Sequence, residues 1–192
     1  MRRVIYIKST NDKHILSLGI SEGEDCARYT LDEKFVLEMG LSPRCEIDEG
    51  DYEKIKSRDE YIRAKKKALS ILSFADNSRR SLLQKLARAG IGRVCAERVT
   101  EEMQSLGYIN EGKQLWRLVL RLANSSLFGP KKIMASLVSK GYAPDAVRQT
   151  VRELIDSGEI DLSENKRKLL EKHSVDEGDT EAENRLLYKN GY

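Results

Sequence analysis

The chain has 192 residues, of which 40% are hydrophobic and 34% are charged, with 34 Lys and Arg against 31 Asp and Glu. This composition indicates a soluble, charge-rich protein that favours helices, long enough for one sizeable core or for a small domain followed by a repeat array. No apolar run approaches the roughly 18 residues that span a bilayer, and the start lacks a signal-peptide pattern, so a cytoplasmic protein without membrane contact is expected.

The rare residues argue against a metal site or a catalytic constellation. Cys26, Cys45 and Cys95 are odd in number, far apart and in no C-x-x-C arrangement, which indicates neither a disulfide framework nor a zinc site. The two histidines, His14 and His173, lie at opposite ends of the chain, and no phosphate-binding P-loop motif is present. We therefore expect no cofactor, no metal and no enzymatic activity.

Charge is distributed unevenly along the chain. Residues 1–58 carry a net charge of −2, residues 59–157 carry +8 and residues 158–192 carry −3. A basic excess of this size attracts polyanions at long range. The central segment is therefore the expected binding region.

The first 30 residues are typical of β-strands. Val4–Ile7 is rich in β-formers, Asn11-Asp12 is a turn signal, and Ile15–Leu18 resumes an apolar pattern. A two- or three-stranded antiparallel sheet is expected, and it must pack on something else to be stable.

The chain then changes to helices. Thr30 or Asp32 is expected to cap a short helix through Glu38, and a further short strand is expected around Cys45–Ile47. From about Asp51, apolar residues recur at three- and four-residue spacing, which predicts amphipathic helices. The breaks and caps between these helices are expected at Asp76-Asn77-Ser78, Gly90, Gly107, Asn110, Gly129-Pro130 and Gly141.

An internal repeat of 51 residues organises these helices. Gly90 and Gly141 share this offset, as do Gly107 and Gly158. Apolar positions recur with them, namely Leu82 with Ile133, Leu83 with Met134, Leu86 with Leu137, Met103 with Leu154 and Ile109 with Ile160. Each unit of three helices buries too little alone, so the units must stack.

The expected fold class is therefore mainly α: tandem three-helix repeats forming a curved array, preceded by a small antiparallel β region. The expected domains are 1–50 for the β-rich region, 51–109 and 110–158 for two repeats, and 159–192 for an incomplete third. Within the third repeat, the acidic stretch Asp176–Glu183 is expected to be a loop before a short final helix.

Several motifs in fixed order carry a family resemblance. They are Ser78-x-x-x-Leu82-x-x-Lys85-Leu86, Gly90-Ile91, Leu106-Gly107-Tyr108-Ile109-Asn110 and Phe128-Gly129-Pro130-Lys131-Lys132-Ile133. Together they resemble the RecX family. The strand-rich start followed by Leu31–Phe35 resembles the N-terminally extended members of Gram-positive bacteria. Two features depart from the pattern: the segment Asn110–Leu115, acidic or aromatic in many relatives, and the shortened third repeat.

The resemblance implies a regulatory protein that lodges in the groove of the RecA–DNA filament. It would suppress strand exchange, ATP turnover and co-protease activity in DNA repair and the SOS response. The implied partners are RecA and its filament on single-stranded DNA, with DNA itself a further partner to test, and a monomer is expected.

Basic helix faces are the candidate binding residues. Lys113, Arg117 and Arg121 lie four apart and share one face. Lys131 and Lys132 begin a helix, where the dipole disfavours cations, so an anionic group is expected nearby. The full candidate set comprises Arg79, Arg80, Lys85, Arg88, Lys113, Arg117, Arg121, Lys131, Lys132, Arg148 and Arg152.

Other interpretations remain open from sequence. A single cationic stripe is most often a solvated helix face, and Trp116 and Phe128 are expected to pack in the core or between repeats rather than stack on bases. A direct DNA-binding helical module that acts without RecA is the main alternative. A scaffold for some other protein also fits the repeats.

Overall fold

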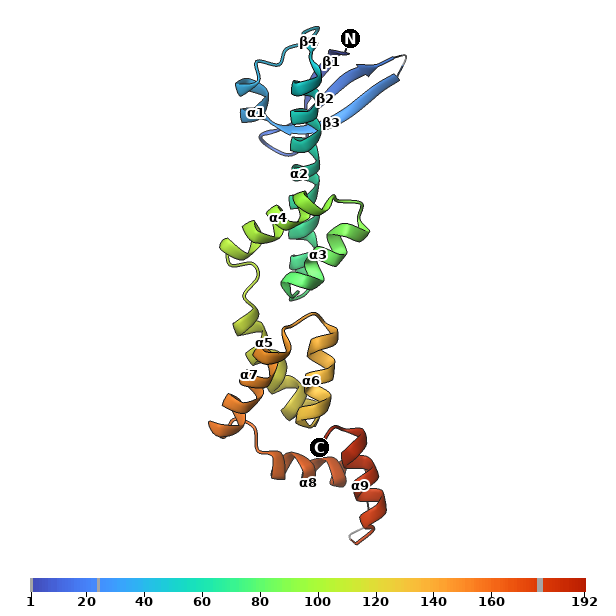
Figure 1. Cartoon of the computed structure of the whole chain (residues 1–192), viewed down its shortest axis with the longest axis vertical. Coiled ribbons are helices and arrows are strands. Elements are labelled where there is room, and N and C mark those ends of the chain that lie inside the picture. The colour runs from blue at the N-terminus through green and yellow to red at the C-terminus, as the bar shows by residue number, and fades with distance from the viewer. Residues whose placement is uncertain (1, 24, 176–177) are drawn as a thin grey trace. The chain divides into compact units, whose positions relative to one another are not determined.

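The structure is a computed structural model that describes residues 2–23, 25–175 and 178–192 (Figure 1). It is mainly α-helical with a small N-terminal antiparallel sheet, which confirms the predicted fold class. The chain divides into two compact units, unit 1 (Met1–Phe74 with Leu83–Met103) and unit 2 (Ala75–Leu82 with Gln104–Tyr192). The predicted domain boundaries stay a prediction.

The sheet of unit 1 contains four strands, one of them very short. They are β1 (Arg2–Ser9), β2 (Ile15–Glu22), β3 (Asp25–Asp32) and β4 (Glu46–Ile47). Their order is β3-β2-β1-β4, and all the pairs are antiparallel. The short strand predicted near residue 46 thus completes the predicted sheet by pairing with the start of β1.

The sheet packs on the helices that follow it. Helix α1 (Glu33–Glu38) is capped by Asp32, whose carboxylate accepts a hydrogen bond of 3.0 Å from the Phe35 N–H. Thr30, the other predicted cap, instead lies in β3. The buried core of this part joins strands, α1 and the first turns of α2 (Glu49–Phe74), and comprises Val4, Leu18, Ile20, Leu31, Val36, Ile47, Tyr52 and Ile55.

The remaining helices follow the predicted breaks. They are α3 (Arg79–Arg88), α4 (Arg93–Ser105), α5 (Glu111–Leu120), α6 (Pro130–Ser139), α7 (Pro144–Asp156), α8 (Leu162–Lys172) and α9 (Thr180–Lys189). A π-helical turn, η1 (Arg121–Ser125), extends α5 and was not predicted. None of the described helices is long and apolar enough to cross a membrane.

Residues paired by the 51-residue offset share backbone conformation and burial. Gly90 and Gly141 both have positive φ, +78° and +91°, and Gly107 and Gly158 have +78° and +77°. Each ends a helix in the left-handed conformation that glycine adopts most readily. The apolar partners Leu82 and Ile133, Leu86 and Leu137, Met103 and Leu154, and Ile109 and Ile160 are all buried.

The core of unit 2 lies among α5, η1, α6 and α7. Pro130 occupies the first turn of α6 after Gly129, as predicted. This core positions the exposed face of α5. Its buried members are Leu115, Val119, Leu122, Ala123, Ile133, Leu137, Tyr142, Val147, Val151, Leu154 and Ile160.

The third, incomplete repeat forms two helices. Asp161 caps α8, and Asp179 caps α9 by accepting a hydrogen bond of 3.0 Å from the Ala182 N–H. The loop predicted over Asp176–Glu183 is therefore wrong for residues 180–183, because the Asp179 cap starts the helix earlier. Residues 176 and 177 lie outside the described residues.

Candidate functional site

Helix α5 presents the predicted cationic face. Asn110 caps the helix by accepting a hydrogen bond of 3.0 Å from the Lys113 N–H, which fixes where the first turn begins. Lys113, Arg117 and Arg121 are all exposed. Arg117 forms an ion pair of 2.6 Å with Asp76, whereas Lys113 and Arg121 form none within the described parts of the chain.

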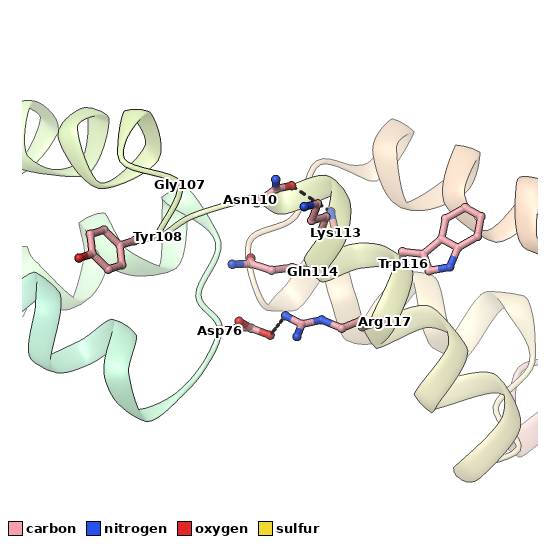
Figure 2. Close-up of a pocket in the computed structure, with 8 residues that line it drawn as sticks. All are labelled: Asp76, Gly107, Tyr108, Asn110, Lys113, Gln114, Trp116 and Arg117. Atoms are coloured by element: carbon pink, nitrogen blue, oxygen red, sulfur yellow. Dashed lines mark hydrogen bonds and ion pairs between the residues drawn. The ribbon is translucent and has the colours of Figure 1, made fainter.

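A pocket of about 460 Å³ lies beside this face, within unit 2 (Figure 2). It is bordered by the segment before α3, the segment before α5 and the first two turns of α5. Its lining residues are Asp76, Gly107, Tyr108, Asn110, Lys113, Gln114, Trp116 and Arg117. The structure thus brings Lys113 and Arg117 together at one cavity.

Gln114 is the buried polar residue of this pocket. Only 3% of it is exposed, and its Oε1 accepts a hydrogen bond of 3.1 Å from the Tyr142 hydroxyl. Burial, together with the negative charges of Asp76 and Glu111, raises the pKa of Tyr142 to about 12. Tyr142 therefore remains a neutral hydrogen-bond donor at any physiological pH.

Trp116 lies at the surface. Its exposed fraction is 36%, and it lines the pocket rather than the core, so of the two expected positions the core one was wrong, and packing between repeats stays a prediction. The reason is helical geometry, because the buried face of α5 is filled by Leu115 and Val119. Phe128 does pack against the core, as expected.

Lys131 and Lys132 contact the end of the chain itself. Lys131 Nζ lies 3.3 Å from the backbone oxygen of Tyr192, and Lys132 Nζ lies 2.9 Å from Asn190 Oδ1. Lys132 also lies over the Phe128 ring, 4.0 Å from its centroid. An anionic group was expected near this helix start, whereas the partners found there are a backbone oxygen and a neutral amide oxygen of the protein itself.

The other candidate cations are spread over both units. Arg148 and Arg152 are exposed on α7, and Arg148 pairs with Asp145 at 2.6 Å. Helix α3 carries the remaining four, of which Arg79 and Arg80 belong to unit 2 and Lys85 and Arg88 to unit 1. The Arg79 backbone N–H donates to Glu111 Oε1 at 2.7 Å, which gives this residue a capping role in the fold.

Unit 1 holds a basic cluster that the sequence analysis missed. The guanidinium groups of Arg58 and Arg98 lie 5.2 and 4.8 Å from the centroid of the Tyr61 ring, beside a pocket of about 380 Å³. Burial and a hydrogen bond to Glu102 raise the pKa of Tyr61. The signal was present as basic residues in α2 and α4, but only the fold shows that they converge on one ring.

None of the three cysteines that the structure describes lines the pocket beside α5. Among the described residues, no group of three or more His, Cys, Asp or Glu side chains is placed to hold a metal ion. The three cysteines are free thiols, and burial raises the pKa of Cys95.

Two of three comparisons with known proteins find similar proteins, and these two agree. No family model matches the chain. The chain is 30% identical over 139 residues to "Regulatory protein RecX" of Clostridioides difficile (strain 630), which covers 68% of this chain and 65% of that protein. It is 23% identical over 186 residues to the protein of the same name from Bacillus cytotoxicus, covering 95% and 68%. The chain thus spans about two thirds of the length of these curated relatives.

Solved structures show the same fold. The crystal structure of a regulatory protein RecX superposes with a TM-score of 0.73 at 17% identity, over 100% of this chain and 95% of the other. The crystal structure of RecX from Lactobacillus salivarius gives 0.58 at 22% identity, over 70% of this chain and 89% of the other.

Proposed function

This chain belongs to the RecX family of regulatory proteins, and we propose that it binds RecA filaments on single-stranded DNA and restrains their activities. The affected activities would be ATP hydrolysis, strand exchange and co-protease function. In this proposal the protein acts by binding rather than by catalysis, and it does so as a monomer in the cytoplasm.

The observation that carries the proposal is the cationic face of α5. Three cations share this face, all three are exposed, and two of them form no ion pair within the described residues. An unpaired exposed cation loses no partner when an anionic group approaches, so it contributes more to binding than a paired one. A nucleoprotein filament offers both phosphates and acidic side chains to such a face.

Titrating RecA's DNA-stimulated ATP hydrolysis with this protein tests the proposal. Inhibition at less than one molecule per RecA protomer is expected, because a ligand that caps or bridges a polymer affects many protomers. Undiminished hydrolysis at excess protein, with folding verified by circular dichroism, would overturn the proposal.

A binding assay separates this function from direct DNA binding. The fluorescence anisotropy of a labelled single-stranded oligonucleotide is measured with this protein alone and with preformed RecA filament. The proposal requires binding to the filament under salt conditions at which free DNA is not bound, because salt screens purely phosphate-driven binding steeply. Equally tight binding to free DNA would favour a module that acts without RecA.

A further inference from the structure

The pocket beside α5 is lined by a side-chain hydrogen-bond donor, Gln114 Nε2, that has no partner among the described residues. Tyr142 donates to Gln114 Oε1, which orients the side-chain amide and leaves Nε2 on the other side. Figure 2 shows this nitrogen directed away from α5, toward the side of the pocket where Asp76 and Tyr108 lie. Within the described residues Nε2 has no partner, although only 3% of Gln114 is exposed.

The equivalent residue of the next repeat shows the contrast. Asn165 lies 51 residues after Gln114, and it too is a buried amide, with 4% exposed. Its Nδ2 donates a hydrogen bond of 3.2 Å to Asn124 Oδ1, so that amide is satisfied within the protein. The nitrogen of Gln114 has no such partner and borders the pocket, so it can donate a hydrogen bond to an acceptor from outside the protein.

The charges around this nitrogen favour a single negative group. Asp76 is engaged by Arg117, which leaves the exposed Lys113 as the uncompensated charge of the pocket lining. The Asp76–Arg117 pair is itself exposed, with side-chain exposed fractions of 45% and 65%. Because an exposed ion pair contributes little free energy, Arg117 can leave Asp76 for a ligand carboxylate at small cost.

The aromatic residues at the two ends of the pocket favour a peptide as its ligand. Tyr108 and Trp116 stand at opposite ends in Figure 2, and both are exposed, with fractions of 54% and 36%. Exposed Tyr, Trp and Arg side chains around a cavity are the residue types that dominate protein–protein binding energy. The volume of about 460 Å³ is large enough for one or two side chains.

We propose that this pocket binds an acidic peptide segment of a partner protein. One Asp or Glu carboxylate of the segment accepts hydrogen bonds from Gln114 Nε2 and Lys113 Nζ, and a neighbouring apolar side chain packs at the rim. The inference rests on the proposed function in one respect, because RecA is the partner from which the segment would come.

Trp116 is the only tryptophan of the chain, so its fluorescence reports on the pocket directly. The probes are overlapping, tryptophan-free 15-residue peptides that cover RecA, together with a 15-nucleotide oligo(dT). We expect at least one acidic peptide to change Trp116 emission saturably. The same peptide with its Asp and Glu replaced by Asn and Gln should bind at least tenfold more weakly.

Two variants and one control locate the binding. Lys113→Ala should weaken the acidic peptide about tenfold, and Gln114→Glu, which keeps the acceptor for Tyr142 but replaces the donor by a carboxylate, should abolish binding. Lys172→Ala removes another exposed lysine of unit 2 and should leave binding unchanged. Lys113 is a surface residue, so its variant keeps the test valid even if Gln114→Glu does not fold.

Inhibition of RecA ATP hydrolysis by the unaltered protein is measured in parallel. Inhibition without any peptide-induced change in Trp116 emission would overturn the pocket inference and leave the proposed function intact. Peptide binding without inhibition would support the pocket and overturn the proposed function. A response to oligo(dT) that Lys113→Ala removes, with none to peptides, would show a nucleic-acid site and overturn the inference.

Discussion

Gly129 and Gly191 bring two stretches of backbone into direct contact. The Gly129 N–H donates to the Asn190 carbonyl at 2.7 Å, and the Lys131 N–H donates to the Gly191 carbonyl at 3.1 Å. A Cβ atom at Gly129 would lie 2.5 Å from the carbonyl carbon and oxygen of Gly191. Backbone carbonyls at the C-terminus of α9 thus accept hydrogen bonds from backbone N–H groups at the N-terminus of α6. Groups at these positions have no hydrogen-bond partner within their own helix.

A similar contact recurs one repeat earlier, at the start of α3. Ser78 Oγ donates to the Lys140 carbonyl at 2.8 Å, and a Cβ atom at Gly141 would lie 2.8 Å from that same Oγ. The end of α6 therefore contacts the start of α3. In the same way, the end of α9 contacts the start of α6. The glycines are needed here for close approach as well as for their positive φ.

Gly191→Ala should loosen the third, incomplete repeat. Its φ is +86°, and the new Cβ would lie 2.3 Å from the Lys132 nitrogen, so strain and overlap should together destabilise unit 2 by about 1–3 kcal/mol. Hydrogen exchange of α8 and α9 amides measures the effect. Gly158→Ala is the control, because its φ is +77° but nothing lies near its Cβ. Equal acceleration in both variants would contradict a role for close contact.

Lys132→Ala should mainly reduce stability. The side chain bonds to Asn190 and lies over the Phe128 ring, so its loss should cost about 1–2 kcal/mol in the free energy of unfolding. Lys131→Ala should cost less, because its bond to Tyr192 is longer, at 3.3 Å, and exposed. Urea unfolding of both variants measures the difference. A larger loss for Lys131→Ala would show that the structural assignment of these lysines is wrong.

Replacing Lys113, Arg117 and Arg121 together by Ala should weaken inhibition of RecA without unfolding the protein. We expect about a tenfold rise in the concentration that halves ATP hydrolysis, since each exposed cation contributes roughly half a kcal/mol.

The matched control for this variant is Ala at Lys34, Lys54 and Arg93. These are exposed cations of unit 1, each in a surface ion pair with a nearby acidic residue of its own helix. Their removal changes the net charge equally. If inhibition falls equally in both triple variants, the effect comes from net charge alone. If the α5 variant inhibits as well as the unaltered protein, α5 is not part of the binding surface.

Tyr142→Phe should change how stability depends on alkaline pH. The pKa of Tyr142 is raised to about 12 from its ordinary value of 10, so the folded state holds the phenolic proton more tightly than the unfolded state. This contribution, roughly 1–3 kcal/mol, is complete below pH 10 and is lost between pH 10 and 12. Unfolding by urea at pH 8 and pH 11 should show a smaller loss in the variant. The same loss in both proteins would place the sensitivity at another tyrosine.

Local features were predictable because they depend on neighbours in sequence. Asn110 caps α5, Gly129-Pro130 separates two helices, and the paired glycines end helices 51 residues apart, all as expected. Capping and helical periodicity involve residues within about four positions of one another, so sequence spacing captures them. The start of α9 was misplaced because an acidic run was given more weight than the cap at Asp179.

The candidate site was predictable only in part. The spacing of the α5 cations predicted that they share one face. It did not predict that Arg117 pairs with Asp76, 41 residues away. The surface position of Trp116 and the capture of Lys132 by Asn190 were likewise missed. Each depends on which segments pack together, and residue type alone does not specify that.

The sequence by itself thus determined most of the helices and their ends, the repeat and the basic character of the central segment. Only the tertiary structure decided which cations remain unpaired, where the pocket lies and that the side-chain amide of Gln114 borders it. The physical reason is range: helix formation and capping are local, whereas burial and ion pairing follow from the packing of segments tens of residues apart.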